Sequence, residues 1–210
     1  MARFLAAALA CLSLVACQNE THPAFSPVPS PTPHVPATSA ILQAGEVPAG
    51  LVACPGSGPI EVYLAVLATE DATVGARAND QWVQLLSLGA REGAIAVYAA
   101  NTSACAADVG ATASVRALTS FVARFADPTQ ASVAWQAGVF GFVPPPTGEL
   151  APGVTVGTST GLGVDSFTYE RPSVRLASWH HGVYVALIVA SNLDLNAFRG
   201  AAATVDPRLN

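Results

Sequence analysis

Four polar side chains in the last third of the chain have the types and the order needed for nucleophilic catalysis. Gly157-Thr-Ser159-Thr-Gly161 matches the Gly-x-Ser-x-Gly pattern, in which a sharp turn between a strand and a helix exposes a serine hydroxyl. Asp165 and then His180 or His181 follow, in the chain order of an acid and a base that activate such a serine. A serine hydrolase acting through Ser159 is therefore one hypothesis for this protein.

The elements that must position this serine are only partly predicted. Val154 to Val156 has the character of a short strand, but the stretch from Leu162 to Asp165 has no helical pattern. Ser159 and His181 are also too close in sequence to hold the several strand and helix units that an α/β-hydrolase places between them. A loop rich in glycine and threonine matches the pattern by chance, so we expect no catalytic residues in this chain.

The two adjacent histidines do not form a metal site by themselves. Neighbours on a strand point to opposite faces, so His180 and His181 cannot hold one ion together. No third Asp, Glu or Cys stands at metal-ligand spacing, and His22 and His34 fall in a proline-rich stretch where we expect them to be solvated. We therefore expect no metal and no cofactor. Trp179, His180 and His181 remain a candidate recognition surface at the tip of a hairpin.

Cys17 has a sequence context that predicts a chemical modification. A basic head, Met1-Ala-Arg3, precedes an apolar run from Phe4 to Ala16, which fits an export signal and is too short to span a bilayer. Leu14-Val-Ala-Cys17 resembles the lipobox of bacterial lipoproteins. The resemblance implies a signal peptide over residues 1–16, a diacylglyceryl group on the Cys17 thiol, and a lipid-anchored protein on the extracytoplasmic side of the cell membrane. A plain secretion signal that happens to contain Cys17 is the alternative.

Two cysteines remain once Cys11 leaves with the signal and Cys17 carries lipid. Cys54 and Cys105 in an exported chain most simply form one disulfide, and two separate buried thiols are the alternative. A metal site is less favoured, because neither cysteine has a second cysteine or a histidine at ligand spacing.

Composition separates a spacer from a folded domain. Residues 17–40 contain the lipidated cysteine and a proline-rich tether, whose prolines favour an extended, semi-rigid chain. The chain as a whole is 51% hydrophobic and 11% charged, so we expect residues 41–210 to form a globular domain. The net charge is -5 and the nine basic residues are scattered arginines, which argues against nucleic acid as a partner.

Periodicity predicts an α+β fold with a single antiparallel sheet of about five strands and helices packed on it. The expected strands cover residues 94–98, 115–125, 166–170, 174–179 and 183–190, the last buried on both faces. The expected helices start at Pro59, near Asn79 or Asp80, after Asp127 and after Asp194. His181-Gly182 is predicted to be the two-residue loop between the last two strands.

The end of the chain resembles a known group of exported domains. Gly163-Val-Asp-Ser166, the strand His181-Gly-Val-Tyr-Val-Ala186 and a terminal helix ending Val205-Asp-Pro-Arg-Leu209 are similar to the end of actinobacterial lipoproteins, including the LpqN type. The extracellular sensor domains of some mycobacterial kinases end similarly. The resemblance implies a compact α+β domain of the PsbP-like kind that binds or senses outside the cell, with no catalytic motif.

Anchor, spacer and fold together lead us to expect a membrane-anchored extracytoplasmic lipoprotein with a non-catalytic domain that binds a ligand or a protein, or acts as a sensor. Its expected partners are the membrane, through the lipid, and an unknown ligand or envelope protein. A cell-envelope serine hydrolase using Ser159 and an accessory subunit of a membrane complex are the alternatives.

Overall fold

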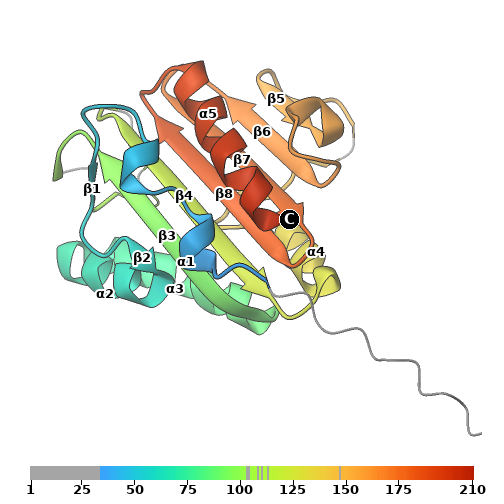
Figure 1. The fold of residues 1–210 in the computed structure, drawn as a ribbon, viewed down its shortest axis with the longest axis horizontal. Coiled ribbons are helices and arrows are strands. Elements are labelled where there is room, and N and C mark those ends of the chain that lie inside the picture. The colour runs from blue at the N-terminus through green and yellow to red at the C-terminus, as the bar shows by residue number, and fades with distance from the viewer. Residues whose placement is uncertain (1–33, 103–104, 108, 110, 113, 147) are drawn as a thin grey trace, which may run out of the picture. The chain divides into compact units, whose positions relative to one another are not determined.

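In the part of the chain that the structure describes, one antiparallel sheet of eight strands organises the fold (Figure 1). The computed structural model describes residues 34–102, 105–107, 109, 111–112, 114–146 and 148–210. The strand order is β1-β3-β4-β8-β7-β6-β5, and β2 also pairs with β3. The strands are β1 (Val52–Ala53), β2 (Gly58–Pro59), β3 (Ala90–Ala99), β4 (Ala117–Phe125), β5 (Val154–Val156), β6 (Ser166–Glu170), β7 (Val174–His181) and β8 (Tyr184–Ser191).

The predicted α+β class is confirmed, but the predicted sheet of about five strands was too small. The five strands expected from the pattern are present as β3, β4, β6, β7 and β8. The three additional strands are β1 and β2, with two residues each, and β5, with three. The short strand expected at Val154 to Val156 is present as β5. The two-residue strands β1 and β2 are too short to show alternation, so only their pairing with β3 identifies them as strands.

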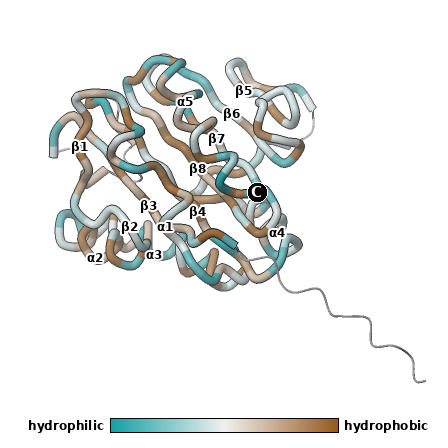
Figure 2. The backbone as a smooth tube through the Cα atoms, in the orientation of Figure 1, coloured by the Kyte–Doolittle hydropathy of each residue, from teal (hydrophilic) through white to brown (hydrophobic). Residues whose placement is uncertain are grey.

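Helices cover both faces of this sheet. Helices α2 (Ile60–Glu70), α3 (Ala72–Ser87) and α4 (Pro128–Ala137) pack on one face, and α1 (Ala37–Ala40) and α5 (Leu195–Val205) pack on the other. Figure 1 shows α1 and α5 in front of the strands, with α2 and α3 behind them. The central strands are therefore apolar on both faces, as the brown central segments of Figure 2 show, and every residue of β8 is buried.

Helix α3 begins earlier than the sequence pattern predicted. Its N-cap is Asp71, whose carboxylate accepts hydrogen bonds from the backbone N–H groups of Thr73 and Val74. In its first two turns Val74 is the only apolar side chain larger than alanine, so the periodicity becomes clear only from Trp82 onward. Small residues are needed there, because a Cβ atom at Gly75 would lie 2.6 Å from the Cα atom of Ala68 in α2. The caps predicted for α4 and α5 are confirmed at Asp127 and Asp194.

The first described residues pack onto the sheet before the boundary expected at residue 41. This N-terminal segment (residues 34–42) crosses the face that carries α5, and Ala37 and Ala40 within it are fully buried. The hydroxyl of Tyr184 donates to the carbonyl of Val35 at 2.7 Å. The backbone N–H of Leu42 donates to the Ser120 hydroxyl at 3.2 Å. The ordered domain therefore includes residues that composition alone assigned to the tether.

The two cysteines expected to pair lie at disulfide distance. The sulfur atoms of Cys54 and Cys105 are 2.05 Å apart, and the pair links the loop after β1 to the loop after β3. Among the residues that the structure describes, no helix is both long and apolar enough to cross a membrane.

Candidate functional site

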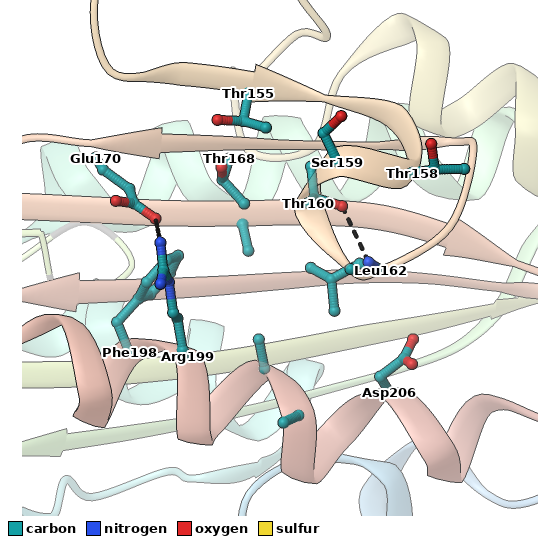
Figure 3. A pocket seen from close by; sticks show the side chains of 14 residues that line it. Thr155, Thr158, Ser159, Thr160, Leu162, Thr168, Glu170, Phe198, Arg199 and Asp206 are labelled. Carbon is teal, nitrogen blue, oxygen red and sulfur yellow. Dashed lines mark hydrogen bonds and ion pairs between the residues drawn. The ribbon is translucent and has the colours of Figure 1, made fainter.

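A cleft between α5 and the outer strands has a volume of about 590 Å³ (Figure 3). This α5 cleft lies beneath the 3-10 helix η4 (Gly157–Thr160), which follows β5. Its volume falls in the range of small-molecule sites. The lining residues are Thr155, Thr158, Ser159, Thr160, Gly161, Leu162, Thr168, Glu170, Ala177, Phe198, Arg199, Ala202, Ala203 and Asp206.

The floor of the α5 cleft is apolar. Phe198 and Ala202 are four residues apart on α5, so they lie on one helix face, and that face packs against Ala177 of β7. The Asp194 cap fixes where α5 starts and therefore which of its residues face the sheet. Leu162 closes the floor at the end of the η4 loop.

Hydroxyl groups form the opposite wall. Thr155 of β5 is paired directly with Thr168 of β6, so both side chains lie on the same face of the sheet. Thr158 and Ser159 of η4 also line this wall, although the Ser159 side chain is directed away from α5 in Figure 3. The Thr160 hydroxyl has a structural role instead, because it lies 2.6 Å from the Ser166 hydroxyl and accepts from the backbone N–H of Leu162 at 3.0 Å.

Charged groups stand at the two ends of the α5 cleft. At one end, Nη2 of Arg199 lies 3.3 Å from Oε1 of Glu170. At the other end, burial raises the pKa of Asp206, while the charge of His181 and the nearby Trp179 indole N–H lower it to a smaller extent. Neither Asp206 Oδ1 nor Trp179 Nε1 reaches standard hydrogen-bond geometry with a described residue, although both atoms are buried.

The structure brings together only two members of the hypothetical catalytic set. Nδ1 of His180 lies 3.3 Å from Oδ2 of Asp165, and Nε2 lies 2.8 Å from the carbonyl oxygen of Gly182. Both ring nitrogens therefore have partners, one in the loop before β6 and one in the turn between β7 and β8. No hydrogen bond joins Ser159 to His180 or His181 among the described residues, and Figure 3 shows the Ser159 side chain directed away from α5. The Gly157–Gly161 motif forms η4, without the helix that a nucleophile elbow requires.

The predicted recognition surface needs correction at Trp179, which is 0% exposed and packs in the core beneath α5. His181 is exposed and His180 is partly buried. The hairpin loop is also shifted by one residue from the prediction. His181 pairs with Tyr184, so the loop is Gly182-Val183, with φ of 54° at Gly182. Glycine is placed first in the loop because that position takes a positive φ.

Two sequence expectations remain, the lipidation of Cys17 and the absence of a metal site. Cys17 lies outside the described residues, so its lipidation stays a prediction. Within the described part of the chain, no group of three His, Cys, Asp or Glu side chains is arranged to hold a metal ion.

Sequence reasoning missed most of the α5 cleft. Thr155, Thr168, Arg199 and Asp206 are single polar residues spread over three segments, and no motif connects them. The available signal was the polar Thr168 and Glu170 positions of β6, which alternate with Phe167 and Tyr169 and therefore had to face something polar.

Comparison with known proteins adds no further assignment. No family model matches the chain, and no curated protein or solved structure is significantly similar to it.

Proposed function

We propose that this protein is a membrane-anchored extracytoplasmic lipoprotein whose domain binds a small polar ligand in the α5 cleft without catalysis. The anchor rests on the lipobox resemblance at Cys17. The observation that carries the binding proposal is the build of the α5 cleft itself. It combines an apolar floor, a wall of hydroxyls and charged groups at both ends, which is how proteins orient a small molecule.

The lining chemistry selects a neutral or cationic ligand rich in hydroxyl groups. Each threonine or serine hydroxyl both donates and accepts a hydrogen bond, as the hydroxyls of a sugar do. Glu170 and Asp206 outnumber Arg199, and Arg199 is already paired with Glu170. The resulting negative excess repels anions and favours an ammonium group near Asp206. A sugar or an amino sugar is the ligand class that fits best.

The absence of catalysis in this proposal follows from the surroundings of Ser159. A serine hydroxyl is a weak nucleophile without a base within hydrogen-bond reach, and the nitrogens of His180 bind Asp165 and Gly182 instead. We expect a fluorophosphonate probe to leave the full-length protein unlabelled. Labelling that disappears in Ser159→Ala would replace the binding proposal with a serine hydrolase.

The binding proposal is tested with three sugars that differ in charge. The full-length protein, reconstituted in phospholipid nanodiscs, is titrated with glucosamine, glucose and glucuronate while ligand saturation-transfer signals are recorded by NMR. We expect signals for glucosamine and glucose and a much weaker signal for glucuronate, because of the negative excess in the cleft.

A pair of tryptophan substitutions on α5 locates the binding. Ala203 is exposed and lines the α5 cleft, so Ala203→Trp should fill it and remove the signals. Asn196 is exposed on α5 away from the lining, so Asn196→Trp should preserve them. Equal signals for all three sugars, or signals that survive Ala203→Trp, contradict the proposal. Co-purification of a stoichiometric envelope protein in place of sugar binding would favour the accessory-subunit alternative.

A further inference from the structure

A second cavity lies on the opposite face of the same outer strands. Phe167, Tyr169 and Leu176 alternate along β6 and β7 with the residues of the α5 cleft, so they point to the other side of the sheet. The segment from Gly141 to Pro145 covers them in part and leaves an open pocket of about 360 Å³. We call this space the strap cavity, and its main lining residues are Phe142, Val143, Pro145, Phe167, Val174 and Leu176.

A tight turn and three prolines allow the segment from Gly141 to Pro145 to lie over an apolar surface. Helix α4 ends at Ala137, and a tight turn follows in which Phe140 has a φ of 49°. The Phe140 ring packs edge-on against Phe121 at 4.9 Å between centroids, which fixes the turn. The prolines that follow, at 144 to 146, have no N–H group to leave unsatisfied. Val143, 56% exposed, stands at the opening of the strap cavity.

A cationic group, Arg171, lies beside Tyr169 at the edge of the strap cavity. Among the described residues that line it, Tyr169 is the only one with a polar side-chain atom. The Tyr169 hydroxyl accepts a hydrogen bond from Nε of Arg171 at 3.0 Å, and the guanidinium carbon lies 5.5 Å from the centre of the Tyr169 ring. The remaining guanidinium N–H groups of Arg171 have no hydrogen-bond partner among the described residues, and no described carboxylate pairs with them.

Three arginines of the domain pair with a carboxylate, whereas Arg171 is among those that have no carboxylate partner in the described part of the chain. Arg124 pairs with Glu92, Arg199 with Glu170 and Arg208 with Glu46. A guanidinium that has kept two N–H groups free can bind a carboxylate through two parallel hydrogen bonds. An apolar cavity with one such group beside it is complementary to a molecule that has a hydrocarbon chain and an anionic end.

We propose that the strap cavity binds the chain of a fatty acid, with Arg171 holding the carboxylate. The hydrocarbon lies against Phe167, Val174 and Leu176 and is removed from water there. Tyr169 orients Arg171 through its hydroxyl and its ring. This site is separate from the α5 cleft in position and chemistry, so it does not depend on the sugar proposal.

The test places a photoreactive residue at the opening of the strap cavity. p-Benzoylphenylalanine replaces Val143 in the full-length protein in nanodiscs, dodecanoate is added, and adducts are identified by mass spectrometry after irradiation. We expect a dodecanoate adduct at position 143. Val83, 51% exposed on α3, is the matched control position and should give only background. Equal adduct yields at positions 83 and 143 would overturn the proposal, as would an adduct with a peptide of this chain or of another protein.

A charge reversal tests the role of Arg171. Arg171→Glu changes an exposed turn residue and should lower the dodecanoate adduct yield at least five-fold, because the carboxylate loses its cation and meets a like charge. The yield with dodecan-1-ol should be unchanged in the same variant. Arg91→Glu, at an exposed position of β3, controls for the change in net charge. A dodecanoate yield that Arg171→Glu does not alter would refute the proposed carboxylate site.

Discussion

The Tyr98 hydroxyl donates a hydrogen bond of 2.9 Å to the carbonyl oxygen of Leu42, across 56 residues of sequence. Tyr98 projects from strand β3, and Leu42 ends the N-terminal segment that crosses the sheet. The backbone N–H of Leu42 donates a hydrogen bond to the Ser120 hydroxyl. Both backbone groups of Leu42 are thereby satisfied in the core, so this contact attaches the start of the domain to its sheet.

Tyr98→Phe removes this hydrogen bond and should lower the free energy of unfolding by about 1 kcal/mol. Burial, and to a smaller extent the charge of Glu46, raises the pKa of Tyr98 in the folded state. Its contribution to stability is therefore present below pH about 10 and is lost as pH rises through the folded pKa. Denaturant unfolding at pH 7 and pH 10.5 checks this, since Tyr98→Phe should lose less stability than the unmodified protein between these two pH values.

Tyr169→Phe is the control, because that hydroxyl binds only Arg171 in the described residues. An equal loss of unfolding free energy at pH 7 in Tyr98→Phe and Tyr169→Phe would contradict the argument.

Two helical glycines should respond to alanine with opposite signs. At Gly75 the new Cβ atom would meet the Ala68 backbone at 2.6 Å, so Gly75→Ala should separate α2 and α3 and cost about 1–3 kcal/mol. At Gly200, on the exposed side of α5, nothing lies within 4 Å of the new atom. Gly200→Ala should therefore stabilise by about 0.5–1 kcal/mol through helix propensity. Thermal unfolding of the two variants decides, and a stabilised Gly75→Ala would show that the helices are not in close contact.

Reduction of the Cys54–Cys105 pair should lower the melting temperature by several degrees. The cysteines are 51 residues apart, and closing a loop of that size restricts the unfolded chain by about 4 kcal/mol in the chain-entropy model. Calorimetry with and without reductant measures the change, and the double variant Cys54→Ser, Cys105→Ser should match the reduced protein. Identical melting in both conditions would exclude a stabilising disulfide.

Asp206→Asn should stabilise the protein at pH 7. Burial raises the folded pKa of Asp206 above its usual value of 3.8. The contribution of Asp206 to the free energy of unfolding is fully present below pH 3.8 and is lost as pH rises through the folded pKa. Glu46→Gln is a control of opposite sign, because the hydrogen bond from Arg208 lowers the pKa of Glu46, whose contribution is present above its unfolded pKa. Melting temperatures from pH 3 to pH 7 test both, and parallel curves for the Asp206 variant and the unmodified protein would contradict the assignment.

The mature protein should begin at Cys17 with a diacylglyceryl group on the thiol. Intact-mass and peptide mass spectrometry of protein extracted from membranes detects it, and Cys17→Ser should release the protein from the membrane fraction. A mature N-terminus elsewhere, or one without acyl mass, would remove the anchor from the proposed function.

Local sequence patterns were sufficient where one segment contains all the relevant information. The caps Asp127 and Asp194 accept hydrogen bonds from N–H groups three residues ahead, so a short window identifies them. The five long strands show their alternation or their continuous apolar character within themselves. The pairing of Cys54 with Cys105 followed from having two candidates left.

Only the tertiary structure determined which side chains from separate segments of the chain lie together. The α5 cleft joins Thr155, Thr168 and Asp206 from separate segments, and the strap cavity forms where Pro145 crosses Phe167. Trp179 looked like a surface residue because the strand pattern does not indicate which face α5 will cover. Side-chain periodicity depends on neighbours along the chain, whereas sites depend on long-range packing, and packing is determined by the whole core at once.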